Sequence, residues 1–188
     1  MSRTQTGAAV RPGLLGLLRN DARANAHDLR AAVVVLFFRV AVAARGQGAR
    51  PRRASIPVVV LYKLVVEWVL GIELPLRLRA GPGLKLYHGH GLVVHPRTVL
   101  GSDVVLKHGV TLGHRGDESE EGPCPTIGDR VVFGPHSQVL GGVTVGDDAR
   151  IGAGAVVLSD VPAGGSAVGV PARVITAVGH GASDAEPQ

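Results

Sequence analysis

Four histidines within a short segment, His88, His90, His95 and His108, are the side chains of this sequence best suited to chemistry. A neutral imidazole can act as a general base near neutral pH, or it can bind a metal ion. His90 has an H-x4-H spacing to His95 and, in the repeat described below, lies one full coil before His108, on which it would stack. A catalytic zinc ion needs three protein ligands, and the sequence offers only this pair in register. The histidines therefore favour base catalysis over a metal site.

Cys124 is the one cysteine of the chain, which excludes an intramolecular disulfide framework and a thiolate cluster. A thiol becomes a nucleophile when a neighbouring base or a helix N-terminus lowers its pKa. Neither flank of Cys124 supplies such a group. Thiol catalysis is therefore the minor alternative to base catalysis by histidine.

The segment that must position these residues repeats every six residues from Val94 onward. The first position of each hexad is large and apolar: Val94, Leu100, Leu106, Leu112, Ile127, Phe133, Val139, Val145, Ile151 and Val157. The fifth position is small or β-branched: Thr98, Val104, Val110, Val131, Ser137, Val143, Ala149, Ala155 and Val161. A helix has a period of 3.6 and a half-buried strand a period of 2, so neither explains this pattern.

A period of six predicts a solenoid in which each coil is a triangle of three short strands. The first and fifth residues of each hexad point inward, and three hexads make one coil. Glycine at the second position, as at Gly101 and Gly134, suits a sharp turn or a positive φ. Counting back by sixes from Val94 reaches His88, where an inward aliphatic residue is due. We therefore expect either an irregular first coil or a diverted side chain at His88.

The repeat also divides the chain. We expect an N-terminal helical region over residues 1–70, a β-helix over 71–175 and a flexible tail over 176–188. Polar, acidic residues 114–126 interrupt the register and predict a protruding loop. The N-terminal region predicts helices over residues 12–20, 22–45 and 55–70, with a linker over 46–54.

Composition and charge exclude several classes of protein. The chain has 188 residues, a net charge of +5 and an apolar fraction of 45%, which excludes wholesale disorder. Ten arginines lie in the first 53 residues, against Asp21 and Asp28 as the only acids there. Aromatic residues are only 3% of the chain, and nucleic-acid binding would need them interleaved with the positive charge. We therefore expect no nucleic-acid partner.

Two apolar stretches, residues 31–44 and 56–70, are interrupted by charges and fall short of the ~20 residues that span a bilayer. They are best interpreted as buried amphipathic helices. The alternative is peripheral contact, because a basic, apolar N-terminal region can lie on an anionic membrane surface. We find no targeting segment, so we expect a cytoplasmic protein.

Several stretches carry a resemblance to a known family. The hexads, YHGHGLVVHPRTVLGSDVVLKHGVTLG, the protruding loop, CPTIGDRV and GVPARVI together resemble the serine acetyltransferases, which are hexapeptide-repeat acyltransferases. The resemblance covers residues 71–175. Within the family, the sequence of these motifs is most similar to a branch that acts in exopolysaccharide biosynthesis, the colanic acid acetyltransferases. It implies an all-β, left-handed parallel β-helix with an α-helical appendage, and acetyl-CoA as co-substrate.

The resemblance also implies a catalytic base. The family's histidine falls on His88, which would take the proton from an acceptor hydroxyl as that hydroxyl attacks the thioester of acetyl-CoA. The orienting carboxylate of the family falls on Glu73, where this sequence has Glu instead of Asp. A Glu can still accept the Nδ1–H of the imidazole, although it reaches one methylene further.

Three departures concern the acceptor. The family's second active-site histidine is Cys124 here, and the arginine before it is Pro123. The acidic residue directly before the catalytic histidine is Tyr87. In the family the arginine and the acid contact the carboxylate and ammonium of serine, so a zwitterion loses its ion pairs here. We therefore expect Tyr87 and Cys124 to bind a sugar or polysaccharide precursor, with serine as the alternative acceptor.

The resemblance places the pantetheine of acetyl-CoA along turns containing Gly134, Pro135, Gly152 and Ala153. Arg173 is the candidate for its phosphates, because a guanidinium pairs well with phosphate. The family packs three prisms around a threefold axis, which implies a homotrimer with its sites between subunits. No metal is expected.

Two other interpretations of the sequence stay open. Gamma-type carbonic anhydrases share the β-helix and bind zinc through three histidines, but the third position, about 36 residues upstream, holds no histidine here. The second alternative is a non-catalytic β-helical scaffold, because part of the family's serine-binding site is absent from this sequence.

Overall fold

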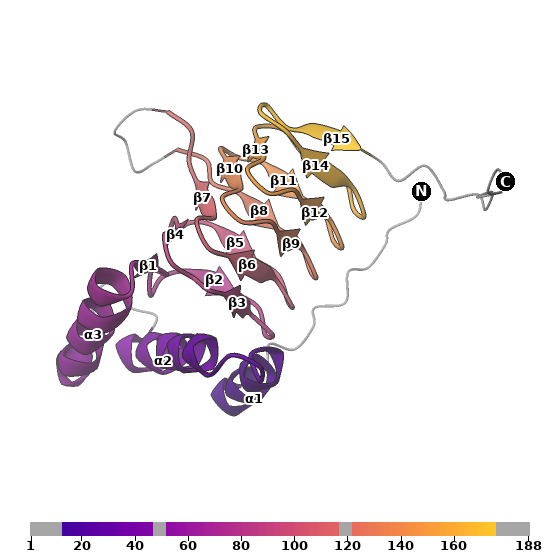
Figure 1. Ribbon diagram of the computed structural model, residues 1–188. Helices are drawn as coiled ribbons and strands as arrows, with labels where there is room; N and C mark the ends of the chain where they lie inside the picture. Colours follow the sequence, from indigo (N-terminus) through magenta and orange to yellow (C-terminus); the bar gives the residue numbers. More distant parts are fainter. Residues whose placement is uncertain (1–12, 47–51, 117–121, 176–188) are drawn as a thin grey trace, which may run out of the picture.

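The computed structural model describes residues 13–46, 52–116 and 122–175. They form a parallel β-helix of about five coils with helices at one end (Figure 1). The fold class expected from the repeat is therefore confirmed. The rest of the chain includes residues 47–51 of the predicted linker, 117–121 of the predicted loop and the predicted tail; these lie outside the described residues.

Three parallel sheets form the sides of the prism. Sheet A contains β1 (Ile72–Glu73), β4 (Leu92–Val94), β7 (Thr111–Gly113), β10 (Gln138–Leu140) and β13 (Val156–Val157). Sheet B contains β2 (Arg79–Ala80), β5 (Val99–Leu100), β8 (Thr126–Ile127) and β11 (Thr144–Val145). Sheet C contains β3 (Lys85–Tyr87), β6 (Val105–Lys107), β9 (Val132–Phe133), β12 (Arg150–Ile151), β14 (Ser166–Val168) and the antiparallel β15 (Arg173–Ile175).

The first coil is irregular, which was one of the two alternatives expected at His88. In later coils Val94 pairs with Leu112, three hexads on, but Leu86 pairs with Leu106, which lies two positions beyond three hexads. The extra positions lie in the turn from β3 to β4. Leu86 therefore fills the inward position and is buried, while His88 is exposed in the turn with φ of 60°. His88 does not replace an inward aliphatic residue.

The glycines at the second hexad position are explained by space, which corrects the expectation of a positive φ there. A Cβ on Gly101 would lie 2.5 Å from the carbonyl oxygen of Gly128 in the next coil. Positive φ occurs instead at the fourth position, for example at Asp103 and Arg130. Glycine is needed at Gly101 because the backbones of neighbouring coils approach closely there.

The helical region comprises α1 (Leu14–Ala24), α2 (Leu29–Arg45), η1 (Arg53–Ser55), α3 (Ile56–Tyr62) and the π-helical η2 (Lys63–Val69). The first helix break was predicted near Asp21, but it falls between Ala24 and Leu29. It falls there because the Asp28 carboxylate accepts the N–H of Ala31 at 3.0 Å and caps α2. None of the described helices combines the length and apolarity needed to cross a bilayer.

Buried polar groups join this region to the first coil. Asp21, in α1, forms a 2.7 Å ion pair with Arg39 of α2, and both are buried. The same carboxylate accepts the backbone N–H groups of Gly83 and Leu84. Arg39 in turn donates to the carbonyl of Ala80 at 2.8 Å. The helices therefore close the N-terminal end of the prism through specific hydrogen bonds.

Candidate active site

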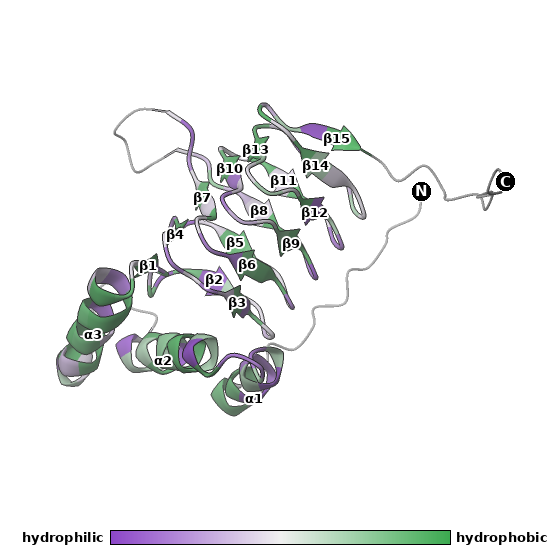
Figure 2. Cartoon of the chain, in the orientation of Figure 1, coloured by the Kyte–Doolittle hydropathy of each residue, from purple (hydrophilic) through white to green (hydrophobic). Residues whose placement is uncertain are grey.

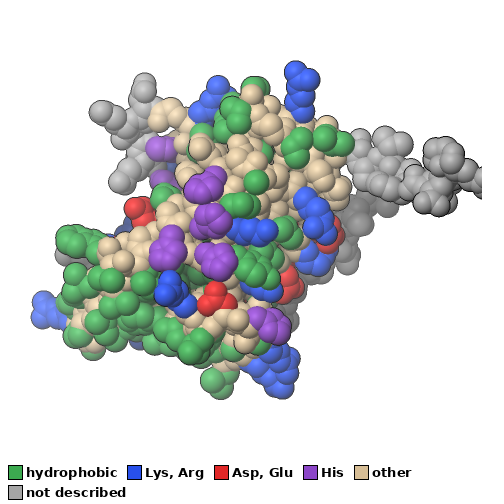
Figure 3. Space-filling model, in the orientation of Figure 1, with side chains coloured by type: hydrophobic (Ala, Val, Ile, Leu, Met, Phe, Trp, Pro, Cys, Tyr) green, Lys and Arg blue, Asp and Glu red, His purple; other side chains and the backbone are tan. Residues whose placement is uncertain are grey.

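One edge of the prism, between sheets C and A, carries a row of histidines (Figure 3). His88, His108 and His136 follow β3, β6 and β9 in successive coils. The ring centroids of His88 and His108 lie 6.3 Å apart, and those of His108 and His136 lie 4.9 Å apart. We call this the histidine edge.

The turns that the resemblance assigns to acetyl-CoA lie on the histidine edge as well. Gly134 and Pro135 lie in the turn from β9 to β10, and Gly152 and Ala153 in the turn from β12 to β13. The fold thus aligns His88 with these turns along one edge. Arg173 lies on the exposed β15 at the far end of sheet C.

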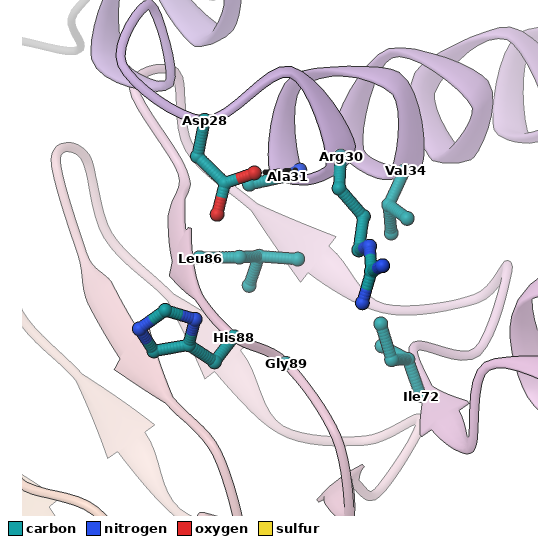
Figure 4. Close-up of a pocket in the computed structure, with 8 residues that line it drawn as sticks. All are labelled: Asp28, Arg30, Ala31, Val34, Ile72, Leu86, His88 and Gly89. Carbon is teal, nitrogen blue, oxygen red and sulfur yellow. Dashed lines mark hydrogen bonds between the residues drawn. The ribbon is translucent and has the colours of Figure 1, made fainter.

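His88 borders a hollow between α2 and the first coil (Figure 4). Asp28 and Arg30 approach it from α2, while Ile72, Leu86 and His88 come from the coil. Within the described part of the chain, the His88 imidazole has no hydrogen-bond partner, and the residue is exposed. Its ring nitrogens are therefore accessible to a substrate hydroxyl.

Glu73 lies on the outer face of β1, where Val93 is its strand partner. Among the described residues, no hydrogen bond joins Glu73 to His88. The charge of Glu73 acts instead on Glu67 of η2. Burial raises the pKa of Glu67, Lys63 opposes that rise, and the nearby charge of Glu73 adds to it. The role of Glu73 as orienting carboxylate stays a prediction.

Asp28 is a second carboxylate near His88 that the sequence analysis did not single out. It lines the same hollow as His88, and one of its oxygens is committed to capping α2. An Asp directly before an apolar helical run is a recognised N-cap signal, so the sequence did contain a pointer to this residue.

Tyr87 lies on the outer face of β3 between two lysines. The Lys85 ammonium lies 4.7 Å from the ring centroid, and that of Lys107 lies 6.0 Å away. The register explains this arrangement, because Tyr87 pairs with Lys107 and lies two residues after Lys85 on the same face. The residue before His88 is therefore flanked by two cationic groups.

Cys124 lies at a different edge, between sheets A and B, beside His95. Its Sγ is 3.0 Å from His95 Nδ1, which also accepts the backbone N–H of Arg97 at 3.2 Å. The Nδ1 that accepts from Arg97 can also accept the thiol proton, and the Gly122 carbonyl, 3.6 Å from Sγ, is a second acceptor for that proton. The structure thus supplies a base that neither sequence flank does. Burial nevertheless raises the pKa of Cys124, with Arg97 opposing the rise, which favours the thiol form.

The expected stacking of His90 on His108 is wrong, because the first coil is two residues longer. His108 lies beside His88, and His90 Nε2 is instead 3.2 Å from Arg30 Nη1. In the described residues, no three His, Cys, Asp or Glu side chains form a group that could hold a metal ion.

Comparison with known proteins gives three kinds of match. The family described as "Bacterial transferase hexapeptide (six repeats)" matches residues 124–159. A serine acetyltransferase of Helicobacter pylori is 47% identical over 112 residues, 60% of this chain and 65% of the relative. The chain therefore spans less than two thirds of that relative's length.

A putative colanic acid biosynthesis acetyltransferase, WcaB of Escherichia coli, is 36% identical over 157 residues, covering 82% of this chain and 96% of the relative. Among solved structures, the apoenzyme of soybean serine acetyltransferase has a TM-score of 0.74 and 30% identity, covering 87% of this chain and 69% of that one. Fold, repeat and nearly full-length similarity agree, and the chain belongs to the serine acetyltransferase-like family of hexapeptide-repeat acyltransferases.

Proposed function

We propose that this protein transfers the acetyl group of acetyl-CoA to a hydroxyl of a sugar or polysaccharide precursor, with His88 as general base. The observation that carries the proposal is the histidine edge. It aligns an exposed imidazole without hydrogen-bond partners among the described residues with the turns at Gly134 and Gly152. Pantetheine along those turns would bring the thioester to His88.

The reaction is a direct transfer in a ternary complex. His88 takes the proton of the acceptor hydroxyl while the oxygen attacks the thioester carbon. The tetrahedral intermediate collapses, the C–S bond breaks, and His88 returns the proton to the CoA sulfur. The products are an acetyl ester and free CoA. A positioned base of this kind contributes about 10²–10⁴ to the rate.

The acceptor side favours a sugar over serine. The position before His88 is Tyr87, flanked by Lys85 and Lys107, and Pro123 stands where the family has arginine. Serine stays the second candidate because of the 47% identity to the serine acetyltransferase of Helicobacter pylori and the similarity to soybean serine acetyltransferase, whose structure was solved in complex with serine.

We place the complete site between subunits of a trimer. Within one chain His88 and Cys124 lie on different edges of the prism, so a second copy is needed to bring them together. Closed threefold packing achieves this. A stable, active monomer near 19.4 kDa in light scattering would contradict the shared site.

The α3–η2 segment is the candidate for peripheral membrane contact, and Figure 2 shows α3 as largely hydrophobic. Val60, Leu61 and Trp68 are exposed there, and exposed Arg52 and Arg53 precede the segment. An apolar face beside cationic residues suits an anionic lipid surface. Trp68 is the only tryptophan, so vesicles of anionic phospholipid should shift its fluorescence to the blue. An unchanged spectrum would refute the contact.

The function is tested by CoA release from acetyl-CoA with nucleotide sugars, serine and homoserine as acceptors. We expect saturable turnover with a sugar. Saturable turnover with serine at ordinary enzyme concentration would reverse the order of acceptors. No CoA release with any acceptor, together with no CoA binding, would favour a non-catalytic scaffold.

A further inference from the structure

A cleft of about 400 Å³ lies beside His88, between the turn that joins α1 to α2 and the strand β3. The α1–α2 side contributes Asn25, His27, Asp28 and Arg30, among others, and the β3 side Lys85, Leu86, Tyr87 and His88. It is larger than a single amino-acid side chain requires, and it opens directly onto the candidate base.

Lys85 lines this cleft, and Lys107 lies next to it over the ring of Tyr87. The sequence has only three lysines, and two of them, Lys85 and Lys107, lie over the Tyr87 ring. The third, Lys63, lies on η2 within 4.0 Å of Glu67. Within the described ranges neither Lys85 nor Lys107 has a carboxylate within ion-pair distance. Two ammonium groups held on one aromatic ring repel each other, and a bound anion relieves that repulsion.

The carboxylate in the cleft does not neutralise this charge. Asp28 is the only acidic residue in the lining, and it already accepts the N–H of Ala31. Arg30 adds a further positive charge on the same side. A zwitterion would find few partners for its ammonium group here, whereas an anion finds several cationic groups.

The aromatic ring that both ammonium groups approach belongs to Tyr87, the residue directly before His88. Lys85 and Tyr87 share the outer face of β3, and His88 begins the turn at the end of that strand. Consecutive Cα atoms lie about 3.8 Å apart. One sugar unit can therefore place an anionic substituent near the lysines and a hydroxyl near His88.

We propose that the acceptor is a phosphorylated sugar whose phosphate binds at Lys85 and Lys107 beside Tyr87. This inference rests on the proposed acetyl transfer and narrows its acceptor. The shared chemistry is a sugar joined to phosphate, supplied either by a sugar 1-phosphate or by the diphosphate of a nucleotide sugar.

The test is lysine footprinting on the full chain, with an amine-reactive reagent and mass spectrometry. A sugar 1-phosphate and a uridine diphosphate sugar should each slow the labelling of Lys85 and Lys107 several-fold. Lys63 is the internal control and should be labelled at an unchanged rate. Stronger protection by the uridine diphosphate sugar identifies the nucleotide form, and equal protection identifies the phosphate alone as the determinant.

Three results would overturn the proposal. They are no protection of Lys85 and Lys107, equal protection by the neutral free sugar, and protection of the same lysines by CoA alone. The last result would assign the lysines to the phosphates of CoA. Protection without acetyl transfer would leave the anion site standing and refute the proposed function. Acetyl transfer to a neutral sugar without protection of the lysines would support the proposed function and refute the anion site.

Kinetics supply a second readout. Lys85→Ala and Lys107→Ala should each raise KM for the phosphorylated acceptor about tenfold, because each loses a charge-assisted contact. KM for acetyl-CoA should stay unchanged in both variants. Lys63→Ala is the matched control and should leave both constants unchanged. Equal increases in both KM values would contradict a site for the acceptor.

Discussion

The first coil and the later coils of the β-helix are stabilised by different kinds of contact. The later coils stack apolar residues inside the prism: Leu106, Leu112 and Phe133 are fully buried. The first coil is covered by the helices, and its backbone bonds to their buried side chains. Asn25, for instance, donates to the Leu84 carbonyl and accepts from the Leu86 N–H.

This difference shows where the protein departs from its own repeat. A regular coil needs only the next coil as a neighbour, but the first coil has an open end with unsatisfied backbone groups. The polar side chains of α1 and α2 satisfy several of them. The same junction carries the extra turn residues, the cleft and His88. The candidate chemistry therefore lies where the repeat is broken.

The largest effect on stability should follow from Asp21→Ala. The change leaves the Arg39 guanidinium buried without its partner and removes the acceptor of Gly83 and Leu84. Breaking a buried pair in this way costs about 3–5 kcal/mol, measured by denaturant unfolding. The double variant Asp21→Ala with Arg39→Met should lose less than Asp21→Ala alone. A loss below about 1 kcal/mol for the single variant would show that the first coil does not depend on the pair.

A smaller loss is expected from Gly101→Ala in the regular coils. The new methyl group would lie 2.5 Å from the Gly128 carbonyl, so the coils must separate. Overpacking of this kind costs about 1–3 kcal/mol in the free energy of unfolding. Gly113→Ala is the matched control at the same hexad position, because its Cβ would meet nothing closer than 4.0 Å. Equal losses in the two variants would refute the explanation by coil spacing.

Thr98→Val should have a small effect of opposite sign. Thr98 is buried, and its hydroxyl has no hydrogen-bond partner among the described residues. Replacing it by an apolar group of the same shape should stabilise the fold by up to about 1 kcal/mol. Ser137→Ala provides the contrast, since the Ser137 hydroxyl donates to the Gly134 carbonyl at 2.8 Å and its loss should destabilise. A destabilised Thr98→Val variant would point to a partner for that hydroxyl.

The smallest effect concerns an exposed pair between coils, Arg130 and Asp148, joined by two 2.7 Å hydrogen bonds. The bond to Arg130 lowers the pKa of Asp148 below its ordinary value of 3.8. A lowered folded-state pKa adds stability above the unfolded-state pKa, and that stability is lost as the pH falls through the folded-state value. The difference in unfolding free energy between the wild type and Asp148→Asn should therefore shrink as the pH falls from neutral to below 3.8. A constant difference would contradict this linkage.

The sequence predicted the regular coils because their determinants are local. Each hexad repeats the inward residue, so Val94 and Leu112 identify the register without knowledge of the fold. It indicated that the first coil could be irregular, but it could not place the two extra residues, because the turn at His88 has no repeat to be compared with. The pairing of Asp21 with Arg39 likewise depends on how two helices meet.

The candidate site shows the same division. His88 was identified from the motif that surrounds it, and its placement on one edge with Gly134 and Gly152 follows from the periodicity. The contact between Cys124 and His95 joins residues 29 positions apart across the inserted loop. The lysines over Tyr87 come from adjacent coils whose register exceeds three hexads and so breaks the period. Such contacts depend on the irregular parts of the register.

His88, at the irregular end of the repeat, is the proposed base for acetyl transfer. The most direct test is the rate of CoA release by His88→Ala with saturating acetyl-CoA and acceptor, together with calorimetric CoA binding. We expect turnover to fall by about 10²–10⁴ while the affinity for CoA stays nearly unchanged. Unchanged turnover in a folded variant that still binds CoA would contradict it.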